Sequence, residues 1–142
     1  MDRHLDTTRV GPMYLRRCDV AGIVVNALRR GAELLYYDLG AFVVMGNHVH
    51  VLLRPHQAAS RVLQWLKGTT AREANQLLGR TGQAFWQRES YDHLVRDERE
   101  LEGIAAYIEN NPVKAGLAAE ASQYRWSSAW NAPRTSGVPS SG

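Results

Sequence analysis

A chain of 142 residues that is 44% hydrophobic and 22% charged has the size and composition of one folded domain with its own core. Its single cysteine, Cys18, excludes an intrachain disulfide and a cysteine-based zinc site. A net charge of +3 is compatible with a polyanionic partner without identifying one. No apolar run approaches the roughly 20 residues that span a bilayer, and no signal-peptide core is present, so we expect a cytoplasmic protein.

The first 18 residues contain no convincing strand, although the segment from Thr8 to Leu15 has the composition of a short one. A sheet that lacked this strand would expose an edge or pair with another subunit. From Asp19 to Leu35, apolar residues recur at the spacing of an amphipathic helix, and Asp19 is suited to cap it.

A β-hairpin is predicted next. Two apolar runs, residues 36–45 and 48–54, flank the pair Gly46-Asn47, as two strands flank a tight turn. Successive side chains point to opposite faces of a strand, so His48 and His50 share one face of the second strand.

Helical spacing returns from Ser60 to Leu78, and Gly79 is a natural C-terminal stop. The inner stripe of this helix is predicted to consist of Leu63, Leu66, Ala74 and Leu77. A strand follows on which Tyr91, His93 and Val95 share a face.

The last predicted helix starts near Asp97 and ends before Pro112. The order helix, hairpin, helix, strand, helix favours an α+β sandwich, with helices covering one face of a small antiparallel sheet. We expect residues 1–130 to form one domain and residues 131–142, rich in Gly, Pro and Ser, to form a disordered tail.

The two histidines of the hairpin allow more than one interpretation. They are either polar residues on a solvated strand face or a pair of imidazoles that hold one divalent ion, which needs a third ligand from elsewhere. A histidine triad requires a third alternating histidine, and Leu52 stands at that position. A metallohydrolase on a TIM barrel needs a longer chain, and no His-Glu-x-x-His helix is present.

Tyr107 is the second candidate for chemistry. It lies about 60° from the apolar stripe of the last helix, and Asn111 shares its face if the helix continues that far. An ordinary half-buried tyrosine before an Asn-Pro stop explains the same pattern. A phenol has a pKa near ~10, so a nucleophilic tyrosine needs a cation on its phosphate target, which the histidine pair would supply.

Three segments, VVMGNHVHVLL, YIENNPVKAGL and YRWSSA, closely resemble the REP-associated tyrosine transposases, a branch of the HUH single-tyrosine transposases. The similarity runs from about Asp19 to Ala129. It implies a ferredoxin-like fold, with the histidines on a central strand and the tyrosine on a C-terminal helix. It also implies cleavage of single-stranded DNA near the hairpin of a repetitive extragenic palindrome (REP).

By this resemblance, His48 and His50 are metal ligands and Asn111 is the third. Tyr107 is the nucleophile, which forms a 5′-phosphotyrosine link and releases a 3′-hydroxyl; the same link allows strands to be rejoined without ATP. The implied metal is Mg²⁺ or Mn²⁺. The implied partner is hairpin-bearing single-stranded DNA, bound by a monomer or homodimer at the bacterial nucleoid, with no membrane involved.

Gly46 departs from the family, which commonly has proline before the histidines, and we expect a looser hairpin turn. Candidate DNA contacts are basic side chains that solvated surface explains equally well: Arg61, Lys67, Arg72, Arg80, Arg88 and Lys114. Candidates for stacking on unpaired bases are aromatic residues for most of which core packing is the simpler role: Trp65, Phe85, Trp86 and Trp126. His93 is expected near the site as a supporting residue.

The leading hypothesis is therefore a metal-dependent single-strand DNA endonuclease and strand transferase. The alternative is a domesticated protein that binds hairpin DNA and cleaves it poorly or not at all. A metal-binding core without nucleic acid explains fewer residues. The intact tyrosine favours the enzyme, because a protein that only binds DNA has no need of a nucleophile.

Overall fold

The computed structural model describes residues 3–132, apart from the side chains of Glu89 and Tyr91. The predicted tail at 131–142 therefore lies almost wholly outside the described residues. The predicted direction of the Tyr91 side chain also concerns a part of the chain that is not described. The elements, in chain order, are β1 (Arg3–Val10), η1 (Tyr14–Arg16), α1 (Cys18–Glu33), β2 (Tyr37–Val44), β3 (His48–Pro55), α2 (Ala59–Leu78), β4 (Trp86–Val95), α3 (Glu98–Lys114) and η2 (Ala121–Gln123).

The four strands form one antiparallel sheet in the order β2-β3-β1-β4. The prediction of a weak or missing first strand was wrong, because β1 is a full strand in the middle of the sheet. Its inward-facing positions are largely polar: Asp6 and Thr8 are each 3% exposed, and the Thr8 hydroxyl donates to Asp6 Oδ2 at 2.7 Å. A strand that buries a carboxylate and a hydroxyl has no alternating apolar pattern for sequence analysis to detect.

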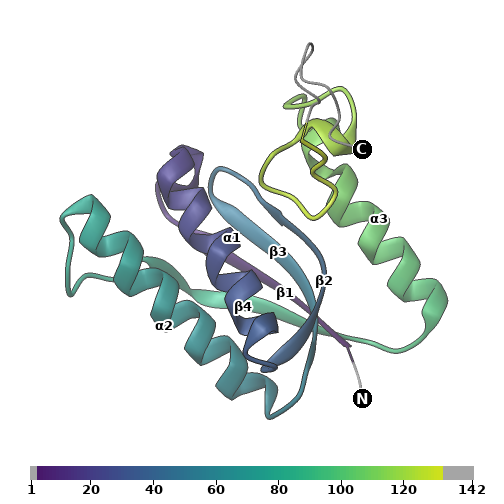
Figure 1. The fold of residues 1–142 in the computed structure, drawn as a ribbon, viewed down its shortest axis with the longest axis horizontal. Coiled ribbons are helices and arrows are strands. Elements are labelled where there is room, and N and C mark those ends of the chain that lie inside the picture. Colours follow the sequence, from purple (N-terminus) through teal and green to yellow (C-terminus); the bar gives the residue numbers. More distant parts are fainter. Residues whose placement is uncertain (1–2, 133–142) are drawn as a thin grey trace, which may run out of the picture.

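The helices lie on both faces of this sheet (Figure 1). Helices α1 and α2 pack together on one face, in the larger core cluster, whereas α3 packs on the other against Val43, Met45 and Leu52. The α+β class is confirmed, but the placement of all helices on one face was wrong for α3. The physical reason is β3, which is buried at every position from Val49 to Leu53 and so requires cover on both faces.

Helices α1 and α2 differ from prediction in detail. Helix α1 begins at Cys18, with Arg17 rather than Asp19 at the N-cap; the Asp19 carboxylate instead accepts bonds from Val20 N–H and Arg17 within the first turn. Helix α2 ends at Leu78 as predicted, and Gly79 caps it with a left-handed φ of 70°. Leu77, predicted to be buried, is 44% exposed.

Val62, Thr69 and Thr70 are buried in α2, so its inner face is rotated from the expected stripe. Within residues 3–132, no helix combines the length and the apolarity needed to cross a membrane.

Helix α3 continues through Pro112 to Lys114, beyond its predicted end. Proline lacks an N–H, which removes one hydrogen bond, but here it lies in the last turn, is buried, and starts the C-terminal cap. Leu117 N–H donates to Pro112 O at 2.9 Å, and Gly116, with φ of 76°, donates to Val113 O at 3.0 Å. Because the helix continues, Asn111 keeps a helical position one turn after Tyr107.

The chain after α3 covers part of the free edge of β2. Val44 N–H donates to Trp126 O at 2.8 Å, and Ser128 N–H donates to Phe42 O at 3.0 Å. The Ser128 hydroxyl also donates to Glu109 of α3 at 2.7 Å. This segment, part of the YRWSSA motif, therefore protects a sheet edge and ties α3 to the sheet.

Ile108 is the test of how strongly α3 is attached. Its side chain is fully buried between α3 and the sheet, so Ile108→Ala should lower the free energy of unfolding by about 2 to 5 kcal/mol. Leu77→Ala, at a half-exposed position of α2, should change it by only about 0.5 kcal/mol. Urea denaturation followed by circular dichroism measures both, and equal losses would contradict this packing.

Candidate active site

The two histidines lie at the start of β3 and face α3. Their ring centroids are 4.8 Å apart with an interplanar angle of 74°. His50 is 8% exposed and His48 is half-buried. The prediction that they share one face is confirmed, and Leu52, the next residue on that face, belongs to the core beneath α3.

Each imidazole is held through one nitrogen. His48 Nδ1 lies 2.8 Å from Asn47 Oδ1, and His50 Nδ1 lies 2.9 Å from Thr7 Oγ1. A carboxamide oxygen only accepts, so His48 Nδ1 carries the hydrogen and its Nε2 keeps a free lone pair. The Thr7 hydroxyl allows the same tautomer for His50. Imidazoles that ligate metals are oriented in this way, by an oxygen partner on the nitrogen that does not bind the metal.

Neither oxygen partner is predicted by the sequence as part of the site. Asn47 precedes His48 and was interpreted only as a turn residue. Thr7 stands directly opposite His50 in the pairing of β1 with β3, and no local pattern connects two residues so far apart in the chain.

The surroundings of the pair keep both rings neutral. Burial, with the nearby Arg9 guanidinium, lowers the pKa of His48. Burial, followed by His48 and Arg9, lowers the pKa of His50 to about 4. Arg9 stands opposite His48 on β1 and is exposed, so it places a positive charge beside the pair. Neutral imidazoles are the form that binds metal ions, and sequence analysis did not single out Arg9.

Helix α3 brings Tyr107 to the same place. The centroid of its ring lies 5.8 Å from that of His50, and half of the side chain is exposed. Lys114 Nζ lies 6.0 Å from the centroid of the Tyr107 ring, which gives this lysine a place beside the tyrosine. Asn111 is half-buried, and its carboxamide makes no hydrogen bond to the residues that the structure describes. The site thus combines a phenol and two imidazoles, and an amide without a hydrogen bond to the described residues lies one turn farther along α3.

The residues of the site fit a divalent ion only in part. Among the described residues, no group of three or more His, Cys, Asp or Glu side chains is arranged to hold a metal. The histidine pair offers two free Nε2 atoms, and Asn111 offers an oxygen. Nitrogen with carboxamide oxygen suits Mn²⁺, and Mg²⁺ favours oxygen more strongly. A set with no carboxylate leaves both charge and coordination positions to be supplied by a substrate.

Most predicted DNA contacts lie away from this site. Helix α2, with Arg61, Lys67 and Arg72, is in the layer on the opposite face of the sheet. Lys67 lies 4.0 Å from the buried Asp6 carboxylate, and Arg80 is held by the Tyr14 hydroxyl.

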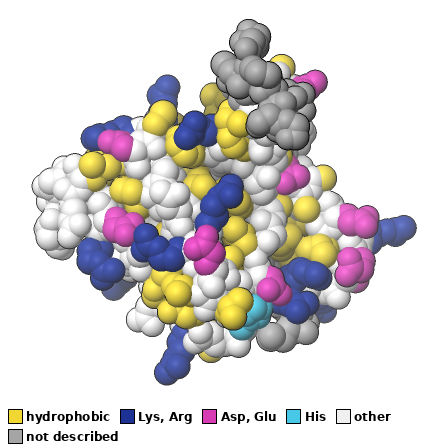
Figure 2. All heavy atoms as spheres, in the orientation of Figure 1, with side chains coloured by type: hydrophobic (Ala, Val, Ile, Leu, Met, Phe, Trp, Pro, Cys, Tyr) yellow, Lys and Arg dark blue, Asp and Glu magenta, His cyan; other side chains and the backbone are white. Residues whose placement is uncertain are grey.

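Arg88 is exposed on β4, and only Lys114 reaches the tyrosine. On the face shown in Figure 2, basic side chains are spread among acidic ones rather than gathered into one band.

The four aromatic residues that were candidates for base stacking pack in or against the larger core cluster instead. Phe85 is 4% exposed, and Trp65 and Trp126 pack against the same core cluster. Trp86 also packs there and donates its Nε1–H to Thr70 at 2.9 Å. His93 lies on β4 and contacts Glu100 of α3, which makes it a link between strand and helix.

Gly46 sits in a closely packed turn. Leu15 N–H donates to Gly46 O at 3.0 Å, and Met45 N–H donates to His48 O at 2.8 Å across the turn. A Cβ atom on Gly46 would lie 2.5 Å from Met13 Cε. Contrary to the expected loosening, glycine lets η1 and the chain before it close over the hairpin next to the histidines.

This chain is similar to known proteins in sequence and in fold. A sequence model of the family described as IS200-like transposases matches residues 19–111. A solved structure of a REP-associated tyrosine transposase bound to a REP hairpin is similar in fold, with a TM-score of 0.71 and 18% identity over 89% of this chain and 75% of that one.

A crystal structure of a proposed transposase from Deinococcus radiodurans R1 has a TM-score of 0.55 and 25% identity, over 78% of this chain and 89% of that one. No curated protein sequence matches this chain.

Burial of His50 predicts a pH-dependent stability. Histidine in an unfolded chain has a pKa near ~6.5, so between this pH and the folded-state pKa of about 4 the unfolded state binds more protons. The resulting stabilisation is present above pH ~6.5 and is lost as the pH falls through 4, and it amounts to about 3 kcal/mol.

We expect His50→Gln to flatten the rise of unfolding free energy between pH 4 and ~6.5, measured by urea denaturation in EDTA. An unchanged slope in the variant would show that His50 does not carry this effect.

Proposed function

The chain belongs to the IS200-like transposase family, and from this premise we propose that it cleaves and rejoins single-stranded DNA at REP-type hairpins through Tyr107. The observation that supports this most is the position of the Tyr107 ring 5.8 Å from His50, although the two residues come from different elements. An exposed phenol beside two neutral imidazoles is the arrangement that a phosphotyrosine mechanism needs. A protein that only binds hairpins would have no use for it.

We propose that His48 and His50, through Nε2, and Asn111, through its carboxamide oxygen, hold Mg²⁺ or Mn²⁺. When bound, this ion would withdraw charge from the scissile phosphate and orient it. Thr7 and Asn47 keep the two rings in place for that role, at 2.9 and 2.8 Å from the Nδ1 atoms.

The residues of the chain then account for each part of the reaction. The Tyr107 oxygen attacks phosphorus and forms the 5′-phosphotyrosine bond, while the bond to the 3′ oxygen breaks. The phenolic proton leaves to solvent, and the 3′ oxygen takes up a proton to become the released hydroxyl. The positive charges of Lys114, beside the Tyr107 ring, and of Arg9, opposite His48, attract the negatively charged phosphate. Attack by a 3′-hydroxyl on the phosphotyrosine reverses these steps without ATP.

The decisive experiment looks for the covalent intermediate. The full chain, mixed with Mn²⁺ and labelled single-stranded hairpins from its own genome, should give a protein–DNA adduct that survives denaturant. Tyr107→Phe should give none, because it lacks the attacking oxygen.

Tyr36→Phe is the matched control, since Tyr36 lies at the other end of the hairpin, against Trp65, and its loss should leave the adduct intact. An adduct formed by Tyr107→Phe, or none from the wild type with any native hairpin, would refute the proposal.

A charge substitution tests the third ligand. Asn111→Asp adds a carboxylate to the proposed set, so the variant should bind Mn²⁺ about tenfold or more tightly without DNA, measured by electron paramagnetic resonance of free Mn²⁺. Asn110→Asp places the same charge on the neighbouring exposed position and should change little. If the two variants bind Mn²⁺ equally, Asn111 is not a ligand.

A further inference from the structure

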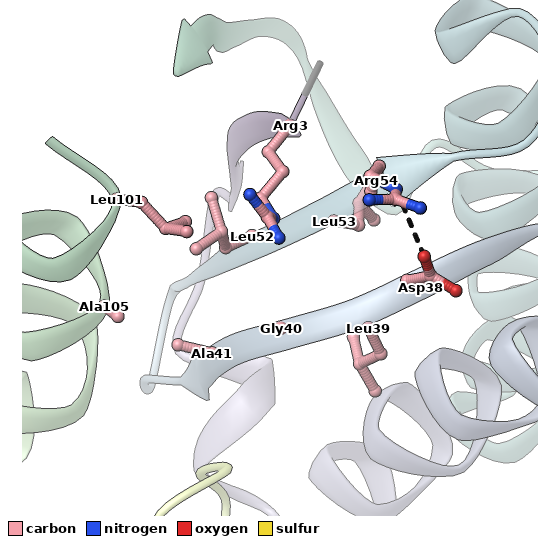
Figure 3. A pocket seen from close by; sticks show the side chains of 10 residues that line it. All are labelled: Arg3, Asp38, Leu39, Gly40, Ala41, Leu52, Leu53, Arg54, Leu101 and Ala105. Atoms are coloured by element: carbon pink, nitrogen blue, oxygen red, sulfur yellow. Dashed lines mark ion pairs between the residues drawn. The ribbon is translucent and has the colours of Figure 1, made fainter. Parts of the chain in front are cut away.

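A cavity of about 310 Å³ adjoins the candidate active site, between β2, β3 and α3 (Figure 3). Its lining is apolar where Leu52 and Leu101 approach each other, and its charged lining residues are Arg3, Arg54 and Asp38. The volume is at the lower end of the range of ~300 to 1,000 Å³ that is typical of small-ligand sites. We refer to it as the α3 cavity.

The α3 cavity and the active site share one strand face and one helix. Side chains alternate along β3, so Leu52 and Arg54 follow His48 and His50 on the face toward α3, and Leu52 is about 7 Å from His50 along the strand. On α3, Ala105 precedes Tyr107 by two positions, about 3 Å along the helix axis but about 200° around it, so the cavity and the tyrosine lie on different flanks of the helix. The short path between the two sites therefore runs along β3, where Leu52 follows His50, and a strand bound at the histidines would reach the cavity within about one nucleotide.

Small residues create the space. Gly40 and Ala41 lie in the irregular part of β2 between Leu39 and Phe42, and Ala105 lies on the helix opposite. None of these side chains is long enough to close the gap between the sheet and α3. A tightly packed interface would have larger residues at such positions, because an empty apolar volume costs stability.

The guanidinium groups of Arg3 and Arg54 at the rim have N–H donors that are not all used in hydrogen bonds. Arg54 Nε lies 3.2 Å from Asp38 Oδ2, an ion pair drawn in Figure 3, yet this buried nitrogen makes no hydrogen bond. Arg3 Nη1 is 3.7 Å from Glu98 in a pair whose members are largely exposed, and such pairs hold their partners weakly. Guanidinium groups with spare donors recognise phosphate.

We propose that the α3 cavity binds one unpaired nucleotide of the DNA strand, next to the scissile phosphate, with its base against Leu52 and Leu101 and its phosphate at Arg3 and Arg54. The inference rests on the proposed function, which supplies the strand. Leucine side chains bury the face of any base by the hydrophobic effect, without selecting among the four bases, and the flanking guanidiniums favour a nucleotide over an uncharged ligand. Holding this neighbouring nucleotide places the scissile phosphate at Tyr107, where orientation contributes to the rate.

The first test uses deoxynucleoside 5′-monophosphates as probes, with the full chain labelled with ¹⁵N. Each of the four should shift the amide resonances of Gly40, Ala41, Leu52 and Ala105 in a saturable way, and the matching nucleosides should bind more weakly. Ala105→Leu fills the cavity from α3 and should abolish these shifts. Ala106→Leu makes the same change on the exposed side of the helix and should leave them intact.

Arg54→Gln is a second variant that leaves the apolar lining in place. It should reduce the preference for the monophosphate over the nucleoside. No shifts in the wild type, or shifts that persist in Ala105→Leu, would overturn the proposal, as would saturable binding of nucleosides as tight as that of monophosphates.

The second test separates this inference from the proposed function. On a Tyr107→Phe background, Ala105→Leu should weaken binding of a fluorescent 12-nucleotide single strand roughly 10-fold, the effect expected for one bound base, and Ala106→Leu should not. If the adduct forms but Ala105→Leu binds DNA normally, the cavity proposal fails and the proposed function stands. If nucleotides bind in the cavity but no adduct forms, the proposed function fails and the nucleotide site stands.

Discussion

Burial of β3 on both faces is the constraint on which this structure depends. Five consecutive residues of the strand, Val49 to Leu53, are buried, and alternation sends them to two different cores. One set meets α1 and α2, and the other meets α3. The histidines belong to the second set by register alone, so the layer that covers this face is also the layer that carries Tyr107. A shift of one residue would turn both imidazoles to the opposite face.

Strand β1 lies beside β3 in the middle of the sheet, so its polar side chains lie next to the two histidines. The face of β1 that is turned toward α3 carries Thr7 and Arg9, which stand opposite His50 and His48. The other alternation buries Asp6, and burial raises the pKa of this carboxyl. The cost of burying the Asp6 carboxylate is only partly offset, by a hydrogen bond from the Thr8 hydroxyl at 2.7 Å and by Lys67 at 4.0 Å. A residue with such a cost is tolerated because the cooperative sheet holds the strand in place.

Helix α3 is attached at several points without filling the space beneath it. Ile108 provides the buried contact with the sheet, His93 meets Glu100 near the start, and Ser128 meets Glu109 farther along. Small side chains between these points leave the α3 cavity, with its two arginines, on the same face of β3 as His48 and His50. Leu101, Ile104 and Ala105 add contacts with the same core cluster but are only partly buried, and the α3 cavity lies beside Leu101 and Ala105.

The sequence by itself determined the α+β class, the hairpin, the shared face of His48 and His50, and the amphipathic helix that carries Tyr107. These depend on local periods of two and 3.6 residues, which short segments carry. Only the tertiary structure decided the rest. It placed β1 at the centre, because the strands that β1 pairs with, β3 and β4, are distant from it in sequence, and it placed α3 on the second face of the sheet. It also brought Thr7 and Arg9 to the histidines, since strand pairing joins residues that no local pattern connects.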